Sequence, residues 1–167
     1  AMTRLCAAAD VITPNITEAC LMCGIDPATA FAEAEGDPAG VAHRLSDRLF
    51  ELAGGRRLRT MVITGIHCRG GIATVTRDLS CCDDVSVFIQ PRVGRDYPGT
   101  GDIFASVLLG GLLSGATAAQ AAEDASRFSA LCAERTASLC PDEPVRDGVA
   151  LEPLLGVLAT GRFRDEK

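Results

Sequence analysis

The sequence predicts an α/β protein built on a layered α/β/α sheet. Apolar runs typical of buried strands occupy residues 59–65, 71–78 and 84–91, and helical runs are interleaved with strands along the chain. Two long helical runs follow the last of these strands, at residues 100–114 and 117–139. Strands interleaved with helices favour a sheet covered by helices, with ligands near the carboxyl ends of the strands.

Stop signals define the first strand and the first full helix. The apolar run at residues 10–13 ends at Pro14, which forces a turn. A helix follows, with Asn15 or Thr17 as its N-cap and Gly24 as its end.

The next segments are a predicted connection and a second helix. Residues 26–40 are rich in Pro, Gly and acidic residues, and we expect a surface connection there. Residues 41–55 predict a helix that ends in a glycine pair. Its apolar face consists of Val41, Leu45, Leu49 and Leu52.

The later elements complete one predicted domain. The strands at 71–78 and 84–91 alternate well enough to be neighbours in the sheet. A last helix is expected over 149–159, before a charged tail. Because no internal repeat or linker divides the chain, residues 1–167 are expected to form a single domain.

Composition argues against two classes of partner. The formal net charge is −6 and no basic stripe is present, so a nucleic-acid partner is not expected. The longest apolar run, residues 103–119, is rich in Gly and Ala and is shorter than the roughly 20 residues that span a bilayer, so no membrane partner is expected. The first ten residues lack the pattern of a signal peptide, and a cytoplasmic protein is the default expectation.

The eight cysteines are expected to be reduced and to behave as small hydrophobic residues. Cys20 and Cys23 have the spacing of metal ligands, but no second such pair and no paired histidines follow. Structural zinc needs four nitrogen or sulfur ligands, so no zinc site is expected.

A glycine-rich turn at residues 99–102 marks a candidate anion site at a helix start. Gly99 and Gly101 permit backbone conformations, and a close approach of a ligand, that other residues prevent. The first N–H groups of the helix favour an anion there, such as a phosphoryl group during transfer. Asp102 could accept a proton from an attacking hydroxyl group, but an acidic residue in a first turn is also favoured by the helix dipole alone.

Two further strand ends carry candidate ligand-binding residues. Asn15 and Glu18 share one face of a first helical turn, where they could hold hydrated Mg²⁺ or could simply cap the helix. Thr64 and Gly65 lie at the carboxyl end of a predicted strand, where an α/β sheet presents ligands. Arg69, in the next turn, could meet a phosphate or remain solvated.

Together and in this order, these segments resemble the ribokinase-like superfamily, and within it the pyridoxal and pyridoxamine kinases of vitamin B6 salvage. The Gly-x-Gly-Asp motif of the superfamily matches residues 99–102, and its Asn-x-x-Glu motif matches residues 15–18. Sugar kinases of the superfamily more often carry Gly-Ala-Gly-Asp. Hydroxymethylpyrimidine kinases share the "TPN…E" segment but commonly have Cys in place of Asp102. The resemblance covers the chain from Leu5 to about residue 140.

The resemblance implies ATP-dependent phosphorylation of the 5′-hydroxymethyl group of a B6 vitamer, with ATP and Mg²⁺ bound. Asp102 would be the general base. Glu18, with Asn15, would organise Mg²⁺ and the ATP phosphates, with Glu18 reaching the metal through water. The anion hole would consist of Gly99, Thr100 and Gly101, and the other nucleotide-binding residues would be Thr13, Thr64, Gly65, Gln90, Pro91, Arg92 and Val93.

The resemblance also implies that the chain is the C-terminal half of the fold. Members of the family are nearly twice this length, and their N-terminal half holds the pyridoxal-binding side chains and much of a homodimer interface. The start at residues 3–10 resembles the last turn of a helix and agrees with a truncated chain. Three functions stay open: a B6-vitamer kinase that is a homodimer at full length, a hydroxymethylpyrimidine or sugar kinase of the same superfamily, and an inactive fragment that persists as a binding or assembly module.

Overall fold

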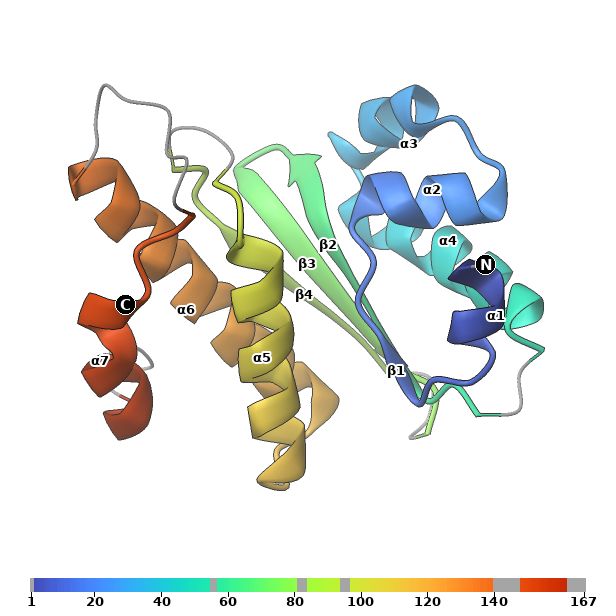
Figure 1. The fold of residues 1–167 in the computed structure, drawn as a ribbon. Helices are drawn as coiled ribbons and strands as arrows, with labels where there is room; N and C mark the ends of the chain where they lie inside the picture. Colours follow the sequence, from blue (N-terminus) through green and yellow to red (C-terminus); the bar gives the residue numbers. More distant parts are fainter. Residues whose placement is uncertain (1, 55–56, 81–83, 94–96, 140–147, 162–167) are drawn as a thin grey trace. The chain divides into compact units, whose positions relative to one another are not determined.

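The structure is a computed structural model that describes residues 2–54, 57–80, 84–93, 97–139 and 148–161 (Figure 1). The chain divides into two compact units, Ala1–Ile89 and Gln90–Lys167, and each unit is described by itself. The first unit combines a four-stranded sheet with helices and the second consists mostly of helices, so the predicted α/β class is confirmed. The strands do not alternate regularly with helices, because β2, β3 and β4 follow one another directly.

A four-stranded sheet organises the first unit, in the order β1-β2-β3-β4. Strand β1 (Val11–Ile12) runs parallel to β2 (Thr60–Cys68), and β2 runs antiparallel to β3 (Gly71–Asp78). Strand β4 (Asp84–Gln90) lies beside β3, which confirms the predicted neighbours. Strand β2 continues three residues past the predicted end at residue 65, because it forms a hairpin with β3.

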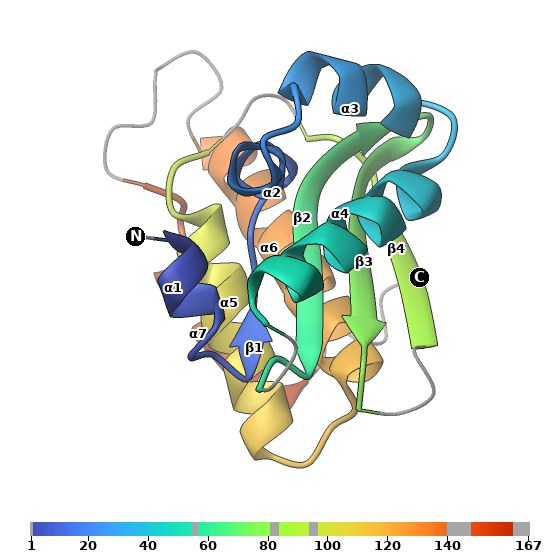
Figure 2. The same cartoon turned by 90° about the vertical axis from the view of Figure 1, so that its right-hand side faces the viewer.

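Four helices precede β2: α1 (Met2–Cys6), α2 (Ile16–Cys23), α3 (Pro27–Ala34) and α4 (Pro38–Leu52). Figure 2 shows α4 lying across β2 and β3, with α3 at the upper end of the sheet, where it contacts β2. The core beneath them joins side chains of the helices to the strand residues Met61, Ile63 and Ile66. The predicted face of α4 is confirmed for three of its members, Val41, Leu45 and Leu49, which are buried, whereas Leu52 is only partly buried.

The surface connection predicted at residues 26–40 is wrong, because the segment contains α3 and the start of α4. Its acidic and proline residues are helix-start signals. The Ala28 N–H donates to Asp26 Oδ1 at 3.3 Å, and the Gly40 N–H donates to Asp37 Oδ1 at 2.8 Å. A proline follows each of these aspartates at the first helical position, where its missing N–H costs nothing.

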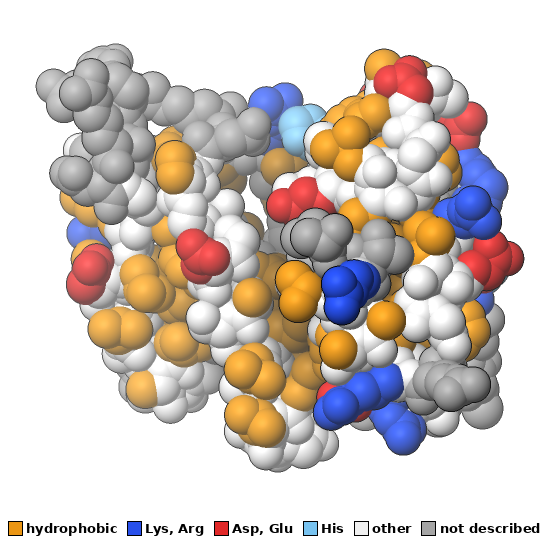
Figure 3. All heavy atoms as spheres, turned by 45° about the vertical axis from the view of Figure 1, so that its right-hand side comes forward, with side chains coloured by type: hydrophobic (Ala, Val, Ile, Leu, Met, Phe, Trp, Pro, Cys, Tyr) orange, Lys and Arg blue, Asp and Glu red, His pale blue; other side chains and the backbone are white. Residues whose placement is uncertain are grey.

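Two packed helices form the centre of the second unit: α5 (Thr100–Leu113) and α6 (Ala118–Leu139), which lie side by side (Figure 1). Their core contains Ile103 of α5 with Phe128 and Cys132 of α6. Figure 3 shows hydrophobic side chains exposed at the lower end of this unit. The exposed residues of α5 include Leu109 and Leu113, at 55% and 80% exposure. No helix in the described part of the chain is long and apolar enough to cross a membrane.

The last helix is shorter than the predicted 149–159. A 3-10 turn, η1 (Glu152–Leu154), leads into α7 (Leu155–Thr160). Pro153 cannot donate an intrahelical hydrogen bond, so it is tolerated only in the first turn. The residues before it are used elsewhere, since the Ala150 N–H donates to the Thr136 hydroxyl oxygen at 2.9 Å.

We expect the Gly111→Ala substitution to lower the free energy of unfolding by about 1–3 kcal/mol, the usual cost of overpacking a tight contact. A Cβ atom at Gly111 would lie 2.9 Å from the Cβ of Ala121 and 3.3 Å from its Cα, where α5 meets α6. Gly110→Ala is the matched control, because a Cβ there meets nothing within 4 Å. The control should raise stability by up to about 1 kcal/mol, the helix-propensity difference between Ala and Gly.

Urea denaturation followed by circular dichroism measures both variants. Equal free energies of unfolding for the two variants would show that the helices do not pack closely at Gly111.

Candidate functional site

The connection between β1 and α2 holds the first group of predicted site residues. Asn15 is the N-cap of α2, and its Oδ1 atom accepts the Glu18 N–H at 2.8 Å. The Glu18 Oε2 atom accepts the Asn15 N–H at 2.9 Å, which completes a capping box. The capping role that the sequence left open for this pair is therefore present. Gly24 ends the helix, as predicted, and it does so in the left-handed conformation.

The capping box uses only part of the hydrogen-bonding capacity of Glu18. A carboxylate has about four acceptor positions on its two oxygens, and the box occupies one of them on Oε2. The side chain is exposed, and the Oε1 atom accepts no hydrogen bond from the described residues. Capping and an outer contact to a hydrated cation are therefore compatible, and the predicted Mg²⁺ role of Glu18 stays a prediction.

Strand β2 brings Thr64 and Gly65 next to this connection. The Thr64 N–H donates to the carbonyl oxygen of Pro14 at 3.1 Å, and Thr64 forms an isolated parallel bridge with Asn15. A Cβ atom on Gly65 would lie 3.7 Å from the Cβ of Asn15. The structure thus gathers the predicted residues of the first unit, including the half-buried Thr13, just after the carboxyl end of β1. Thr64 and Gly65 lie within β2 and not at its carboxyl end as predicted, because the strand continues to Cys68 in its hairpin with β3. Arg69 is not among them, because it lies in the exposed β2–β3 turn.

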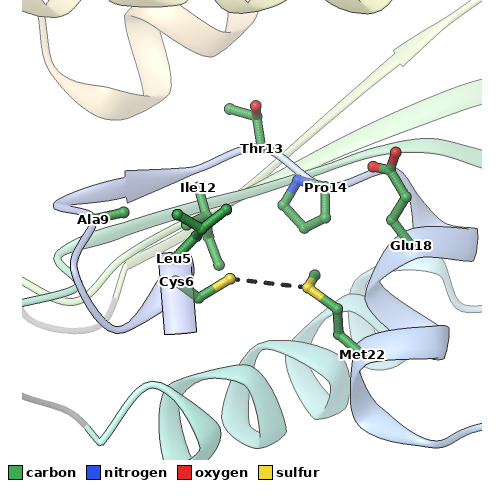
Figure 4. A pocket seen from close by; sticks show the side chains of 8 residues that line it. All are labelled: Leu5, Cys6, Ala9, Ile12, Thr13, Pro14, Glu18 and Met22. Atoms are coloured by element: carbon green, nitrogen blue, oxygen red, sulfur yellow. Dashed lines mark hydrogen bonds between the residues drawn. The ribbon is translucent and has the colours of Figure 1, made fainter. Parts of the chain in front are cut away.

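A pocket of about 240 Å³ lies beside β1 and α2 (Figure 4). Cys6 and Met22 meet in it, with their sulfur atoms 3.8 Å apart. The Thr13 side chain and the Glu18 carboxylate extend to the opposite side from this sulfur pair. No local pattern in the sequence predicts the apolar lining, because it joins residues of α1, β1, α2 and the segments between them: Leu5, Cys6, Ala9, Ile12, Pro14 and Met22.

The start of α5 holds the predicted anion hole and base. Gly99 is the N-cap, with φ at 93°, a conformation that favours glycine. No described side chain caps this helix start. The Thr100 hydroxyl donates to the Tyr97 carbonyl oxygen at 3.0 Å, and the Ile103 N–H donates to the Gly99 carbonyl oxygen at 3.1 Å.

Two features of this helix start fit a phosphate ligand. Gly101 has no positive φ, and a Cβ atom there would meet nothing within 4 Å. Neither backbone strain nor packing therefore requires a glycine here, and the missing side chain leaves the backbone open to close approach. The Gly101 and Asp102 N–H groups donate to no other described residue, and the Asp102 side chain is exposed beside them. Such free N–H groups at a helix start attract anions.

The remaining predicted nucleotide contacts follow β4. Gln90 is the last residue of the strand, and Pro91 and Arg92 are exposed in irregular chain after it. Val93 is partly buried, and the three residues that follow it lie outside the described part of the structure. Like residues 99–102, they belong to the second unit, whereas Thr13, Asn15, Glu18, Thr64 and Gly65 belong to the first.

The cysteines that the structure describes in the first unit are free thiols, buried at Cys6, Cys20 and Cys68 and partly buried at Cys23. Cys20 is fully buried, and the Cys23 thiol donates weakly to the carbonyl oxygen of Leu45, with 3.8 Å between sulfur and oxygen. Burial, with a smaller contribution from Cys20, raises the pKa of Cys23 to about 11. Within the described ranges, no three His, Cys, Asp or Glu side chains converge as metal ligands.

A comparison with protein families matches residues 1–141 to the model described as phosphomethylpyrimidine kinase. The chain belongs to the phosphomethylpyrimidine kinase family. The match covers both candidate sites, at Asn15–Glu18 and at Gly99–Asp102.

Solved structures share the fold of this phosphomethylpyrimidine kinase family member. A provisionally assigned phosphomethylpyrimidine kinase from Bacteroides thetaiotaomicron has a TM-score of 0.75 at 25% identity, with 95% of this chain and 50% of that chain covered. An orthorhombic form of a protein so described, with pyridoxal, gives 0.73 at 23% identity over 95% and 52%. An ADP complex of Bacillus subtilis pyridoxal kinase gives 0.61 at 22% identity, over 80% and 46%.

These likenesses confirm the predicted ribokinase-like fold. The chain spans about half the length of the solved structures it matches.

We expect Asn15→Ala to lower the free energy of unfolding by about 1 kcal/mol, because it removes the side-chain acceptor of the capping box. Asn15→Ser should keep most of the stability, since Ser is also a good N-cap. Thr17→Ala, at an exposed first-turn position, is the matched control. Urea denaturation measures the three variants, and equal losses for Asn15→Ala and Thr17→Ala would contradict a stabilising cap.

We expect the Cys23 and Cys132 thiols to react slowly with iodoacetamide, because only the thiolate is nucleophilic and burial raises both pKa values to about 11. At pH 8 roughly one part in a thousand of each thiol is ionised, so the rate should rise about tenfold per pH unit between pH 8 and 10. Residue-resolved mass spectrometry measures the rates, with glutathione as the reference thiol. Rates close to that of glutathione at pH 8 would contradict the burial.

Proposed function

We propose that the chain carries the phosphate-binding and catalytic-base part of an ATP-dependent kinase that phosphorylates the 5′-hydroxymethyl group of a B6 vitamer. The observation that carries the proposal is the start of α5. There an uncapped helix end, a left-handed Gly99, an otherwise unexplained Gly101 and the exposed Asp102 occur together. Membership of the phosphomethylpyrimidine kinase family supports a kinase at these positions.

Asp102 acts as the general base in this proposal. Its carboxylate takes the proton of the substrate hydroxyl group, and that oxygen forms a bond to the γ-phosphorus of ATP. The bond between the γ-phosphorus and the bridging oxygen breaks, and ADP leaves. The free N–H groups at the start of α5 stabilise the negative charge on the transferring phosphoryl oxygens. Phosphoryl transfer needs little else from a protein beyond positioning.

The first unit supplies the proposed groups for the cation. Glu18 keeps acceptor capacity outside the capping box, and Asn15 holds it in place. Mg²⁺ usually keeps several waters and binds through one or two carboxylates plus substrate phosphates, which suits a chain whose described residues form no closed metal cage. When bound, Mg²⁺ supplies neutralisation of charge on the phosphate oxygens. We propose nucleotide contacts at Thr13, Thr64 and Gly65 of the first unit, and at residues 90–93 of the second.

The substrate class has a second candidate. The matching family model is that of phosphomethylpyrimidine kinase, so hydroxymethylpyrimidine is an alternative acceptor, and its hydroxymethyl group would meet the same base. The B6 vitamer is favoured by Asp102, which stands where the hydroxymethylpyrimidine kinases commonly have Cys. The Bacteroides thetaiotaomicron structure with pyridoxal and the Bacillus subtilis pyridoxal kinase with ADP support the same choice.

We expect Asp102→Asn to lower the rate of phosphoryl transfer by about 100-fold or more, the usual contribution of a general base. Its affinity for a non-hydrolysable ATP analogue should be preserved, because the amide keeps the helix start intact. Glu134→Gln removes an exposed carboxylate of α6 and should change neither quantity. Rates by coupled ADP release and affinities by calorimetry measure both. Near-normal turnover in Asp102→Asn would contradict its role as the general base.

The acceptor is identified by comparing rates on pyridoxal, pyridoxamine, pyridoxine, hydroxymethylpyrimidine and ribose. We expect the B6 vitamers to be phosphorylated fastest. A higher rate on hydroxymethylpyrimidine would favour the second candidate. Nucleotide binding without turnover on any acceptor would instead support a binding module, a function open to a chain that spans half of its structural relatives.

A further inference from the structure

A β-bulge interrupts β2 at the residues that contact Asn15. Ile63 pairs with Val75 of β3, but Ile66 pairs with Ala73, so Thr64 and Gly65 together face a single residue, Thr74. Gly65 takes φ of 67°, in the left-handed region. Bulges re-aim the chain locally and are frequent beside functional sites.

The bulged residues also hold the start of α2. On the other edge of β2, Val11 pairs with Thr60 and Ile12 with Met61, and the same register continues to the bridge between Asn15 and Thr64. The Thr64 N–H donates to the Pro14 carbonyl oxygen at 3.1 Å. The bulge therefore lets Thr64 donate to Pro14 and pair with Asn15 while the rest of β2 stays paired with β3.

We propose that Gly65 is a positioning residue, whose left-handed conformation holds the bulge and thereby places Asn15 and Glu18 for the Mg²⁺–nucleotide. The part of this inference that concerns Mg²⁺–nucleotide binding rests on the proposed function. The part that concerns the positions of Asn15 and Glu18 does not. Space does not explain the glycine, because a Cβ atom would lie in ordinary contact at 3.7 Å from the Cβ of Asn15. The conformation does, since residues other than glycine adopt it at a cost.

An extended backbone at residue 65 would remove the bulge. Residues on one side of it would then shift by one position along β3, and their side chains would exchange faces. Thr64 could not keep both its bond to Pro14 and its place in β2. Asn15, the first residue of the capping box, would then lose its pairing with β2.

The test compares Gly65→Ala with Gly24→Ala. Gly24 has nearly the same φ, 69°, also lies in the first unit, and ends the same helix at the opposite terminus from Asn15. A Cβ atom there meets nothing within 4 Å. Both variants therefore carry the same backbone strain, and only one carries it at the capping box. Gly65→Asn is the rescue variant, because Asn tolerates the left-handed region.

The first readout is amide hydrogen exchange by nuclear magnetic resonance, which needs no ligand. We expect Gly65→Ala to speed exchange of the Thr64, Asn15 and Glu18 amides by about tenfold relative to Gly24→Ala, the scale of a left-handed conformation forced on a residue with a side chain. Gly65→Asn should restore most of the protection. Unchanged exchange at Asn15 and Glu18 in a folded Gly65→Ala would overturn the positioning role.

The second readout is the affinity for adenylyl imidodiphosphate with and without Mn²⁺, as a probe for Mg²⁺. In Gly65→Ala the gain in affinity on adding Mn²⁺ should be about tenfold smaller than in the unmodified chain. In Gly24→Ala this gain should be unchanged. Glu18→Gln should lose a similar part, and combining it with Gly65→Ala should add little, because both act through one carboxylate. Additive losses would overturn the link to Glu18.

The two readouts separate the two proposals. If the unmodified chain binds the analogue but shows no gain with Mn²⁺, the metal half of the inference is wrong. If it binds no nucleotide at all, the proposed function fails together with that half, while the amide exchange still decides whether Gly65 positions Asn15 and Glu18. Should Gly65→Ala fail to fold, Gly65→Asn is compared with Gly24→Asn: we expect the same exchange at Asn15 and Glu18 in both, because Asn tolerates the left-handed region, and faster exchange in Gly65→Asn would overturn the role given to that conformation.

Discussion

The backbone pairing between the Pro14–Asn15 segment and Thr64 is the contact on which the candidate site of the first unit depends. It extends the parallel register of β1, which has only two residues, past the proline that ends the strand. Without it, the last pairing with β2 before α2 would be that of Ile12 with Met61, three residues ahead of the N-cap. Backbone hydrogen bonds are obligatory for buried chain, and Pro14 is buried, so its carbonyl oxygen needs this partner.

The two helix starts differ in how their N–H groups are satisfied. Helix α2 satisfies its own end through a reciprocal capping box, so the side chains of Asn15 and Glu18 are held in defined positions. Helix α5 leaves its end to the solvent, with glycines in place of capping side chains. A self-capped helix end suits ligands held by side chains, whereas an uncapped one suits ligands held by the backbone. The proposed roles in cation and phosphate binding follow this difference.

Local signals in the sequence predicted helix ends and buried helix faces better than they predicted features that depend on tertiary packing. Proline, Asn and Gly around α2 indicated both of its ends, and the spacing of Val41, Leu45 and Leu49 indicated the buried face of α4. Helix α3 was missed because Asp and Pro occur both in loops and at helix starts, and the buried alanines that distinguish the two are weak signals. The bulge in β2 and the apolar pocket depend on strand register and helix packing, which no local pattern contains.

The close contact of Gly111 with Ala121 gives α5 a fixed pivot. From this pivot to Gly101 the helix rises about 15 Å, at 1.5 Å per residue. If the helix tilts as a rigid body about this point, the N–H groups at its other end are displaced by an amount that grows with that distance. Misplacement by about 1 Å can cost a reaction a factor of about 100. The packing of α5 against α6, from Gly111 with Ala121 to Ile103 with Phe128, thus bears on the accuracy with which α5 can present its amides.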